Sequence, residues 1–170
     1  MSSEIREALS GMRRYQPVPW ELIPDLGLYM DQVITFISRM YQPLYGDDMR
    51  SYLSAPMINN YVKGRLIPRP AGKKYSREQI ALLAMIVALK QVSSMDDIRK
   101  MLSLGEGETV EGLYKTFCQR FSRCIHGIEL GESIDFGSLD SALDFAILAS
   151  AFHAGCAAAL KANEPQKDGQ

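Results

Sequence analysis

Seven basic side chains and no acidic one lie between Arg50 and Arg77, in a chain that is acidic elsewhere. The whole chain has 19 Lys and Arg against 20 Asp and Glu, so the other 142 residues carry 12 basic and 20 acidic side chains. A surface that needs only solubility intersperses both signs, whereas a concentrated positive patch neutralises phosphates and releases their counterions. The pattern indicates contact with a phosphate backbone, with a solvated basic loop as the alternative. The seven residues are Arg50, Lys63, Arg65, Arg69, Lys73, Lys74 and Arg77.

A short helix is predicted over Pro56–Lys63, with Ser54 as its N-cap and Gly64 as its C-cap. On a helical wheel one arc is apolar, and the opposite arc carries two amides and an ammonium group. Asn can form a bidentate pair with adenine, and Lys reaches guanine acceptors or phosphates, so this polar arc could read base edges. The alternative is that the amides only hydrate a surface helix. The apolar arc holds Ile58, Tyr61 and Val62, and the polar arc holds Asn59, Asn60 and Lys63.

The segment that follows, Leu66–Tyr75, has two prolines and a glycine between apolar ends, which predicts a small hairpin or wing. Its basic residues are spaced along an extended chain, where they could follow a phosphate backbone. The candidate DNA-binding residues are therefore Asn59, Asn60, Lys63, Arg65, Arg69, Lys73, Lys74 and Arg77.

Most of the chain has helical signals that would hold these residues. The residues Ser76-Arg77-Glu78-Gln79 form a capping box, and the helix after it is expected to show one wide apolar face, made by Ile80, Leu83, Ala84, Val87 and Ala88. An extended linker over 16–24, anchored by Trp20, and a loop over 41–48 separate the first elements. We predict an all-α, mainly helical fold with a small β-wing, its helices covering 3–12, 28–40 (ending before Pro43), 56–63, 76–91, 93–102, 110–125 and 139–162.

The run MINNYVKGRLIPRPAGKKYSREQIALLAMIVALKQVSSMDDIRKML, residues Met57–Leu102, resembles the winged helix-turn-helix of MerR-type transcription regulators. The segments PDLGLYMDQVITFI, MINNYVKGRLIP and KKYSREQIA, within about Trp20–Leu104, also resemble a bacterial family catalogued as domain of unknown function 1836. The MerR resemblance implies that helix 56–63 enters the major groove and that the wing contacts flanking phosphates. The chain departs from the MerR pattern at Asn59, where that family has an arginine.

Composition and the remaining polar residues favour a cytoplasmic protein that is not an enzyme. The chain is 46% hydrophobic and 23% charged, its first residues lack the apolar core of a signal peptide, and its three cysteines form no CxxC pair. Cys118, Cys124 and His126 do not have structural-zinc spacing. The adjacent carboxylates Asp47-Asp48 and Asp96-Asp97 are interpreted as solvated or capping groups. We therefore expect no catalytic residue, cofactor or metal.

The helix expected over Leu139–Ala162 has rows of small residues and is apolar nearly all round. Such a helix must be covered, either by a second subunit or by other helices of the same chain; we expect a homodimer. The predicted organisation is an N-terminal helix and linker (1–18), a winged helix-turn-helix-like domain (19–104), a C-terminal helical region for dimerisation (105–162) and a polar tail (163–170).

Two functions fit these observations. The first is a bacterial DNA-binding transcriptional regulator that binds double-stranded DNA, with an unknown effector. The second is a protein-interaction module that retains the winged-helix fold and uses its basic wing to bind an acidic protein partner.

Overall fold

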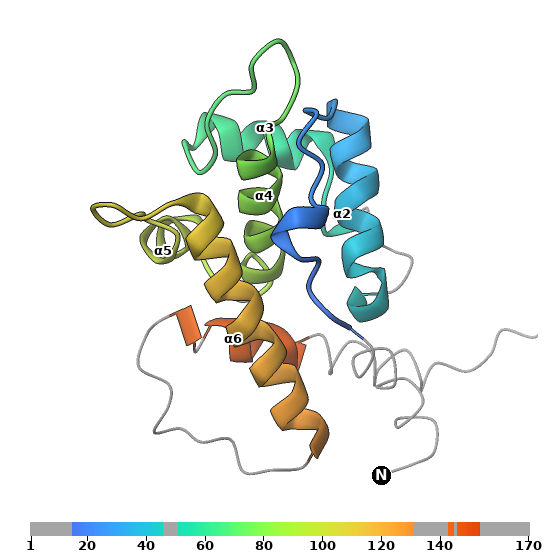
Figure 1. Cartoon of the computed structure of the whole chain (residues 1–170), viewed down its shortest axis with the longest axis vertical. Coiled ribbons are helices and arrows are strands. Elements are labelled where there is room, and N and C mark those ends of the chain that lie inside the picture. The colour runs from blue at the N-terminus through green and yellow to red at the C-terminus, as the bar shows by residue number, and fades with distance from the viewer. Residues whose placement is uncertain (1–14, 46–50, 131–142, 145, 154–170) are drawn as a thin grey trace, which may run out of the picture.

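The computed structural model describes residues 15–45, 51–130, 143–144 and 146–153, and over these it is mainly helical, as predicted (Figure 1). The described residues contain no β-strand, and their β-type pairings are two isolated antiparallel bridges, Leu28 with Tyr75 and Ala71 with Lys74. Some predicted elements lie outside the described residues: the helix over 3–12, part of the helix over 139–162, and the polar tail over 163–170. The elements are η1 (Trp20–Leu22), α2 (Met30–Tyr45), α3 (Ala55–Lys63), α4 (Arg77–Leu89), α5 (Met95–Met101) and α6 (Val110–Leu130).

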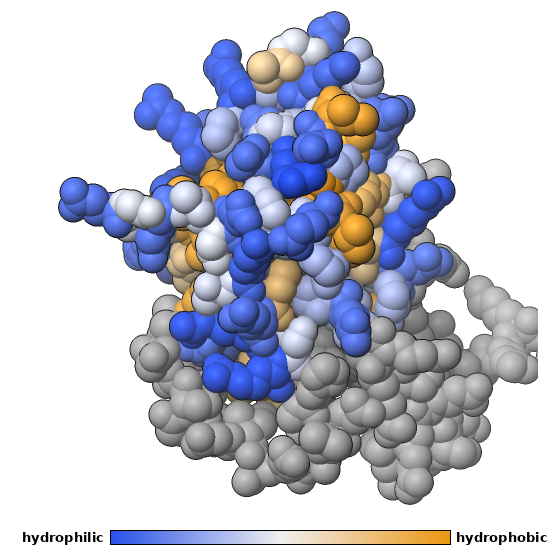
Figure 2. Space-filling view, in the orientation of Figure 1, coloured by the Kyte–Doolittle hydropathy of each residue, from blue (hydrophilic) through white to orange (hydrophobic). Residues whose placement is uncertain are grey.

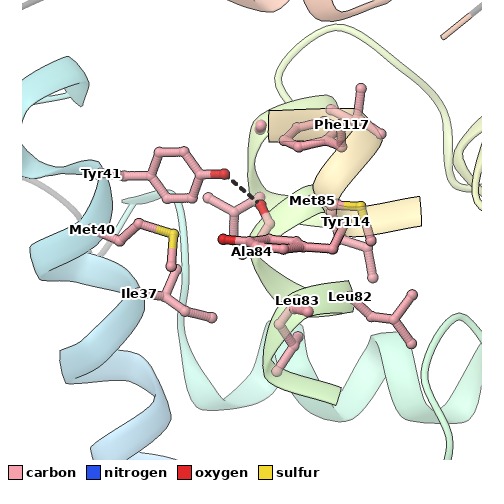
Figure 3. Packing of buried hydrophobic residues seen from close by; sticks show 14 of the residues in the cluster. Ile37, Met40, Tyr41, Leu82, Leu83, Ala84, Met85, Tyr114 and Phe117 are labelled. Carbon is pink, nitrogen blue, oxygen red and sulfur yellow. Dashed lines mark hydrogen bonds between the residues drawn. The ribbon is translucent and has the colours of Figure 1, made fainter. Parts of the chain in front are cut away.

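Helix α4 is the central element of the fold. Every residue from Gln79 to Leu89 is buried, because α2 and α6 pack on different sides of the helix (Figure 1). The prediction of one wide apolar face was therefore incomplete: a helix that is apolar all round has to be covered all round. Figure 3 shows Ile37, Met40 and Tyr41 of α2 and Tyr114 and Phe117 of α6 around α4. The Tyr41 hydroxyl donates a hydrogen bond to the carbonyl oxygen of Ala84, at 2.8 Å.

Helix α2 continues through Pro43, so the prediction that it stops before that proline was wrong. A proline inside a helix removes one backbone hydrogen bond. The last turn nevertheless stays helical, because it buries Leu44 and Tyr45. The ring of Tyr45 also stacks on that of Tyr52, with centroids 4.5 Å apart. These tertiary contacts compensate for the missing hydrogen bond.

Two predicted helix starts are confirmed by their hydrogen bonds. The Ser76 hydroxyl accepts from the Gln79 N–H, and the Gln79 side chain accepts from the Ser76 N–H, which is a complete capping box at the start of α4. The sequence offers Ser93 and Ser94 as alternative caps for the helix predicted over 93–102, and Ser94 is the one that caps α5, accepting from the Asp97 N–H at 3.2 Å. The helix predicted over 110–125 extends to Leu130 as α6.

The C-terminal stretch 143–153 is helical where it is described, and it packs on the same chain. Ala146, Ile147 and Ala151 are buried, and the Ser150 hydroxyl donates to the carbonyl oxygen of Ala88 in α4 at 2.8 Å. The buried Asp144 carboxylate pairs with Arg120 of α6. The predicted small-residue rows are Ala142, Ala146, Ser150 and Ala154, and Ala151, Gly155 and Ala159; their described members, Ala146, Ser150 and Ala151, are thus covered within one chain.

None of the helices in the described ranges is long and apolar enough to span a membrane.

Candidate nucleic-acid interface

Helix α3 presents the two faces that the sequence predicts. Ile58 and Tyr61 are buried, whereas Asn59, Asn60 and Lys63 are exposed. The helix lies across one end of the molecule, and the loop that follows it projects from that same end (Figure 1). Within the described chain, neither Asn59 nor Asn60 uses its side-chain amide for a hydrogen bond. Both amides are therefore available to an external partner. The predicted N-cap Ser54 precedes the helix in extended backbone but makes no side-chain capping bond.

The end of α3 differs from the prediction in one respect that concerns the site. The helix ends at Gly64 as expected, but Gly64 has an ordinary φ of −74°, and the left-handed residue is Arg65, at φ 57°. The Arg65 N–H donates to the Val62 carbonyl (3.1 Å) and the Leu66 N–H to the Tyr61 carbonyl (2.9 Å), which is the Schellman pattern of bonds.

Glycine fits at position 64 because there is little room for a side chain, and not because its φ angle requires glycine. A Cβ atom there would lie 3.2 Å from the carbonyl oxygen of Asn60 and 3.9 Å from the terminal methyl of Met95. The Gly64 carbonyl accepts a hydrogen bond from the Arg99 guanidinium at 2.8 Å, and Arg99 also pairs with Asp96. Sequence reasoning missed Arg99, because its role depends on α5 packing beside the end of α3.

The segment 65–75, here called the basic loop, lies where the β-wing was predicted, and it is a loop anchored at both ends. Ile67 and Tyr75 are buried, and Leu28 and Tyr75 exchange two backbone hydrogen bonds of 3.0 and 2.8 Å. The Gln79 side-chain amide donates to the Pro68 carbonyl at 3.0 Å. Between these anchors Arg69, Lys73 and Lys74 are exposed.

The tip of the basic loop is a tight turn with the type I′ pattern. The Lys74 N–H donates to the Ala71 carbonyl at 3.0 Å, and both central residues have positive φ, Gly72 at 55° and Lys73 at 66°. Such a turn favours Gly or Asn at its centre, yet here one central residue is a lysine. The Lys74 ammonium lies 5.3 Å from the centroid of the Tyr29 ring, a cation–π contact with an exposed aromatic side chain.

Arg77 differs from the other candidate residues because it has intramolecular partners and is half-buried. Its guanidinium lies 3.4 Å from an Asp25 carboxylate oxygen and 5.7 Å from the centroid of the Trp20 ring. This arginine joins the start of α4 to η1. The other candidate residues, here called the basic surface, are exposed, and their cations form no ion pair within the described residues: Asn59, Asn60, Lys63, Arg65, Arg69, Lys73 and Lys74.

The remaining reactive residues have structural surroundings. Burial raises the pKa of the Cys118 thiol to about 11 and also raises the pKa of Cys124, so both are protonated at neutral pH. Asp97, in the first turn of α5, accepts from the Ser94 hydroxyl, and the exposed Asp96 pairs with Arg99. The described ranges hold no group of three or more His, Cys, Asp or Glu side chains that could bind a metal. Asp47, Asp48 and Cys156 lie outside the described ranges.

The fold and the site together define a mainly helical protein with a positively charged surface at one end. The family model described as Domain of unknown function (DUF1836) matches residues 18–117, so the chain belongs to that family. The matched region contains η1, α2, α3, α4 and α5, and the start of α6. Comparison with curated proteins and with solved structures gave no significant match.

Proposed function

We propose that this protein is a bacterial DNA-binding transcriptional regulator that contacts double-stranded DNA with the basic surface. The observation that carries the proposal is the exposure, on one end of the molecule, of five cations that have no counter-charge within the described residues. Figure 2 shows hydrophilic side chains over this end. Like charges held close together repel each other, and a polyanion removes that cost. The five cations are Lys63, Arg65, Arg69, Lys73 and Lys74.

Backbone conformation supports the same surface. Arg65 and Lys73 are the only described residues other than glycine with positive φ, and both belong to the basic surface. A side chain in the left-handed region costs roughly 1–2 kcal/mol, a cost that glycine would avoid. A cation at both positions therefore carries a folding cost, which a contribution of its charge to binding would offset.

The amide pair on α3 supports duplex DNA over other polyanions. In a MerR-like arrangement, α3 would lie in the major groove with Asn59 and Asn60 at base edges, and the basic loop would contact the flanking phosphates. We include in the proposal a homodimer that reads two half-sites. Phe152 is exposed on the outer side of the C-terminal helical stretch and is a candidate contact for the second subunit.

The test is a titration of fluorescent genomic duplex fragments with the full chain at two salt concentrations, followed by light scattering. Binding that weakens steeply with salt supports phosphate contact, because counterions are released. Binding that is absent, or insensitive to salt, overturns the proposal. A monomer at the concentrations that saturate the duplex overturns the dimer.

A second candidate function is the protein-interaction module, which a different observation favours. Leu22, Leu26 and Tyr29 are exposed, and Tyr29 contacts Lys74 of the basic loop. An acidic partner with an apolar contact would suit this combination. In that case Leu26→Gln would weaken partner binding. If the regulator proposal is correct, the same variant should bind duplex DNA as the wild type does.

A further inference from the structure

A cleft of about 580 Å³ opens beside the basic surface, between the end of α3, the start of the basic loop, the early part of α4, the segment that follows α5 and the start of α6. Its size falls in the range of small-molecule sites, about 300–1,000 Å³. Three of its lining residues are cations that also belong to the basic surface, Lys63, Arg65 and Arg69. The rest of the lining is aliphatic: Val62, Leu66, Ile67, Pro68, Leu82, Leu102, Leu104 and Val110.

The cleft leaves aliphatic surface in contact with water. Leu104 is 44% exposed, and Val62, Leu66 and Val110 are half-buried. The Schellman turn at Arg65 directs the chain from α3 into the basic loop and so forms one side of the cleft. Covering this aliphatic surface with a ligand would be favourable in proportion to the apolar area removed from water.

The chemistry of the lining selects one class of ligand. The described lining includes no acidic side chain, so a cationic ligand would find no counter-charge there. An aliphatic tail fits the Leu, Ile and Val walls, and an anionic head fits the three cations. We propose that the cleft binds a free medium-chain fatty carboxylate, with its tail in the cleft and its carboxylate at Lys63, Arg65 and Arg69.

Such a ligand would compete with DNA, a consequence that rests on the proposed function. The carboxylate would neutralise cations that the regulator needs for phosphates, so ligand and duplex would each weaken the binding of the other by the same factor. The cleft would then act as an effector site beside the DNA-binding surface.

The direct test is a calorimetric titration of the full chain, without DNA, with octanoate, decanoate and dodecanoate below their micelle concentrations. We expect one ligand per chain and an affinity that rises about fourfold for each added methylene that is buried. Dodecanol, with the tail but no charge, and acetate, with the charge but no tail, should bind more weakly than dodecanoate. Absence of saturable binding, binding of many molecules per chain, or equal binding of dodecanol overturns the inference.

A matched pair of variants places the ligand. Leu104→Gln removes an exposed cleft residue and should weaken dodecanoate binding at least about tenfold, because a leucine contact is lost. Leu26→Gln is the control, since Leu26 is 87% exposed and does not line the cleft. Equal effects of the two substitutions would overturn the assignment to this cleft.

A second titration separates this inference from the proposed function. Duplex affinity is measured with and without saturating dodecanoate, and dodecanoate affinity is measured with and without saturating duplex. Each ligand should lower the affinity for the other by the same factor. Loss of dodecanoate binding with intact duplex binding overturns the inference alone. Dodecanoate binding without any duplex binding overturns the proposed function alone. Duplex affinity that does not change with dodecanoate overturns the competition.

Discussion

Helices α3 and α4 are neighbours in the chain, but their side chains meet different surroundings. From Gln79 to Leu89, α4 is buried at every position, and the polar side chain of Gln79 is satisfied by the capping box and the Pro68 carbonyl. In α3 only Ile58 and Tyr61 are buried, and the amides of Asn59 and Asn60 have no partner within the described chain. Changes in α4 should therefore alter stability, and changes in the basic surface should alter binding.

The largest effect is expected from Leu83→Ala in α4. Leu83 is fully buried, so the substitution removes its apolar contacts and leaves a cavity. We expect the free energy of unfolding to fall by about 2–5 kcal/mol, measured by urea denaturation. The exposed control Leu26→Ala should stay within about 0.5 kcal/mol of the wild type. Comparable losses in the two variants would contradict the burial of α4.

The burial of Tyr45 predicts how the stability of the core depends on alkaline pH. Burial raises the pKa of Tyr45 to about 12 from its ordinary value of 10, so the folded state holds the phenol neutral while the unfolded chain ionises. The stabilisation is complete below pH 10 and is lost as pH rises from 10 to 12, by about 2–3 kcal/mol. In Tyr45→Phe this part of the pH dependence should disappear, as denaturation at a series of pH values would show. An unchanged alkaline slope would exclude Tyr45 as its source.

Charge reversal in the basic loop should act on binding and spare stability. Lys73→Glu combined with Lys74→Glu removes two predicted phosphate contacts from each subunit, so the slope of log affinity against log salt should flatten by about 2 for each wing and by about 4 for the proposed dimer. Affinity for all duplex sequences should fall together, because phosphates carry no sequence information. The control with the same charge change, Arg39→Glu with Lys100→Glu, alters exposed cations outside the basic surface and should leave the slope unchanged. Unaltered affinity in the loop variant would show that the loop does not contact DNA.

Substitution of the amides should change specificity more than affinity. Asn59→Ala or Asn60→Ala is expected to reduce the discrimination between specific and scrambled duplex by about 1–3 kcal/mol and to leave non-specific binding intact. The ratio of the two affinities, measured for each variant at one salt concentration, is the observable. If both variants keep the wild-type ratio, α3 does not read bases and the interaction module is favoured.

The smallest change in stability is expected from glycine substitutions at the two left-handed cations, which should nevertheless lower duplex affinity. Arg65→Gly and Lys73→Gly relieve positive φ angles, which offsets the greater freedom of glycine in the unfolded chain. We expect the free energy of unfolding to be unchanged or raised by up to about 1 kcal/mol, while duplex affinity falls. Arg69→Gly is the matched control: it removes the same kind of charge without relieving a positive φ, and should lower stability slightly. Variants at Arg65 and Lys73 that lose stability would argue that these cations serve the fold.

Local signals were predictable from the sequence because their partners lie within a few residues. The capping box of Ser76 and Gln79, the Ser94 cap and the two faces of α3 each depend on one or two turns of helix. The exposure of the basic surface also followed from charge, because unpaired cations are costly to bury. The sequence likewise identified Trp20 as an anchor, because a large aromatic side chain in a proline-rich segment gains most from burial, and Trp20 is buried.

Other features were decided by contacts between residues far apart in the chain. Helix α2 passes Pro43 because Tyr45 stacks on Tyr52, and α4 is covered on every side because α2 and α6 pack around it. Arg77 pairs with Asp25, and the carbonyl of Gly64 at the end of α3 accepts a hydrogen bond from Arg99 of α5. A sequence pattern reports the preferences of neighbouring residues, but these outcomes depend on which surfaces meet when the helices pack. The sequence by itself thus determined most of the helices, their caps and the charge of the basic surface, and the tertiary structure decided which of its cations stay exposed and unpaired and which, like Arg77, find a partner within the chain.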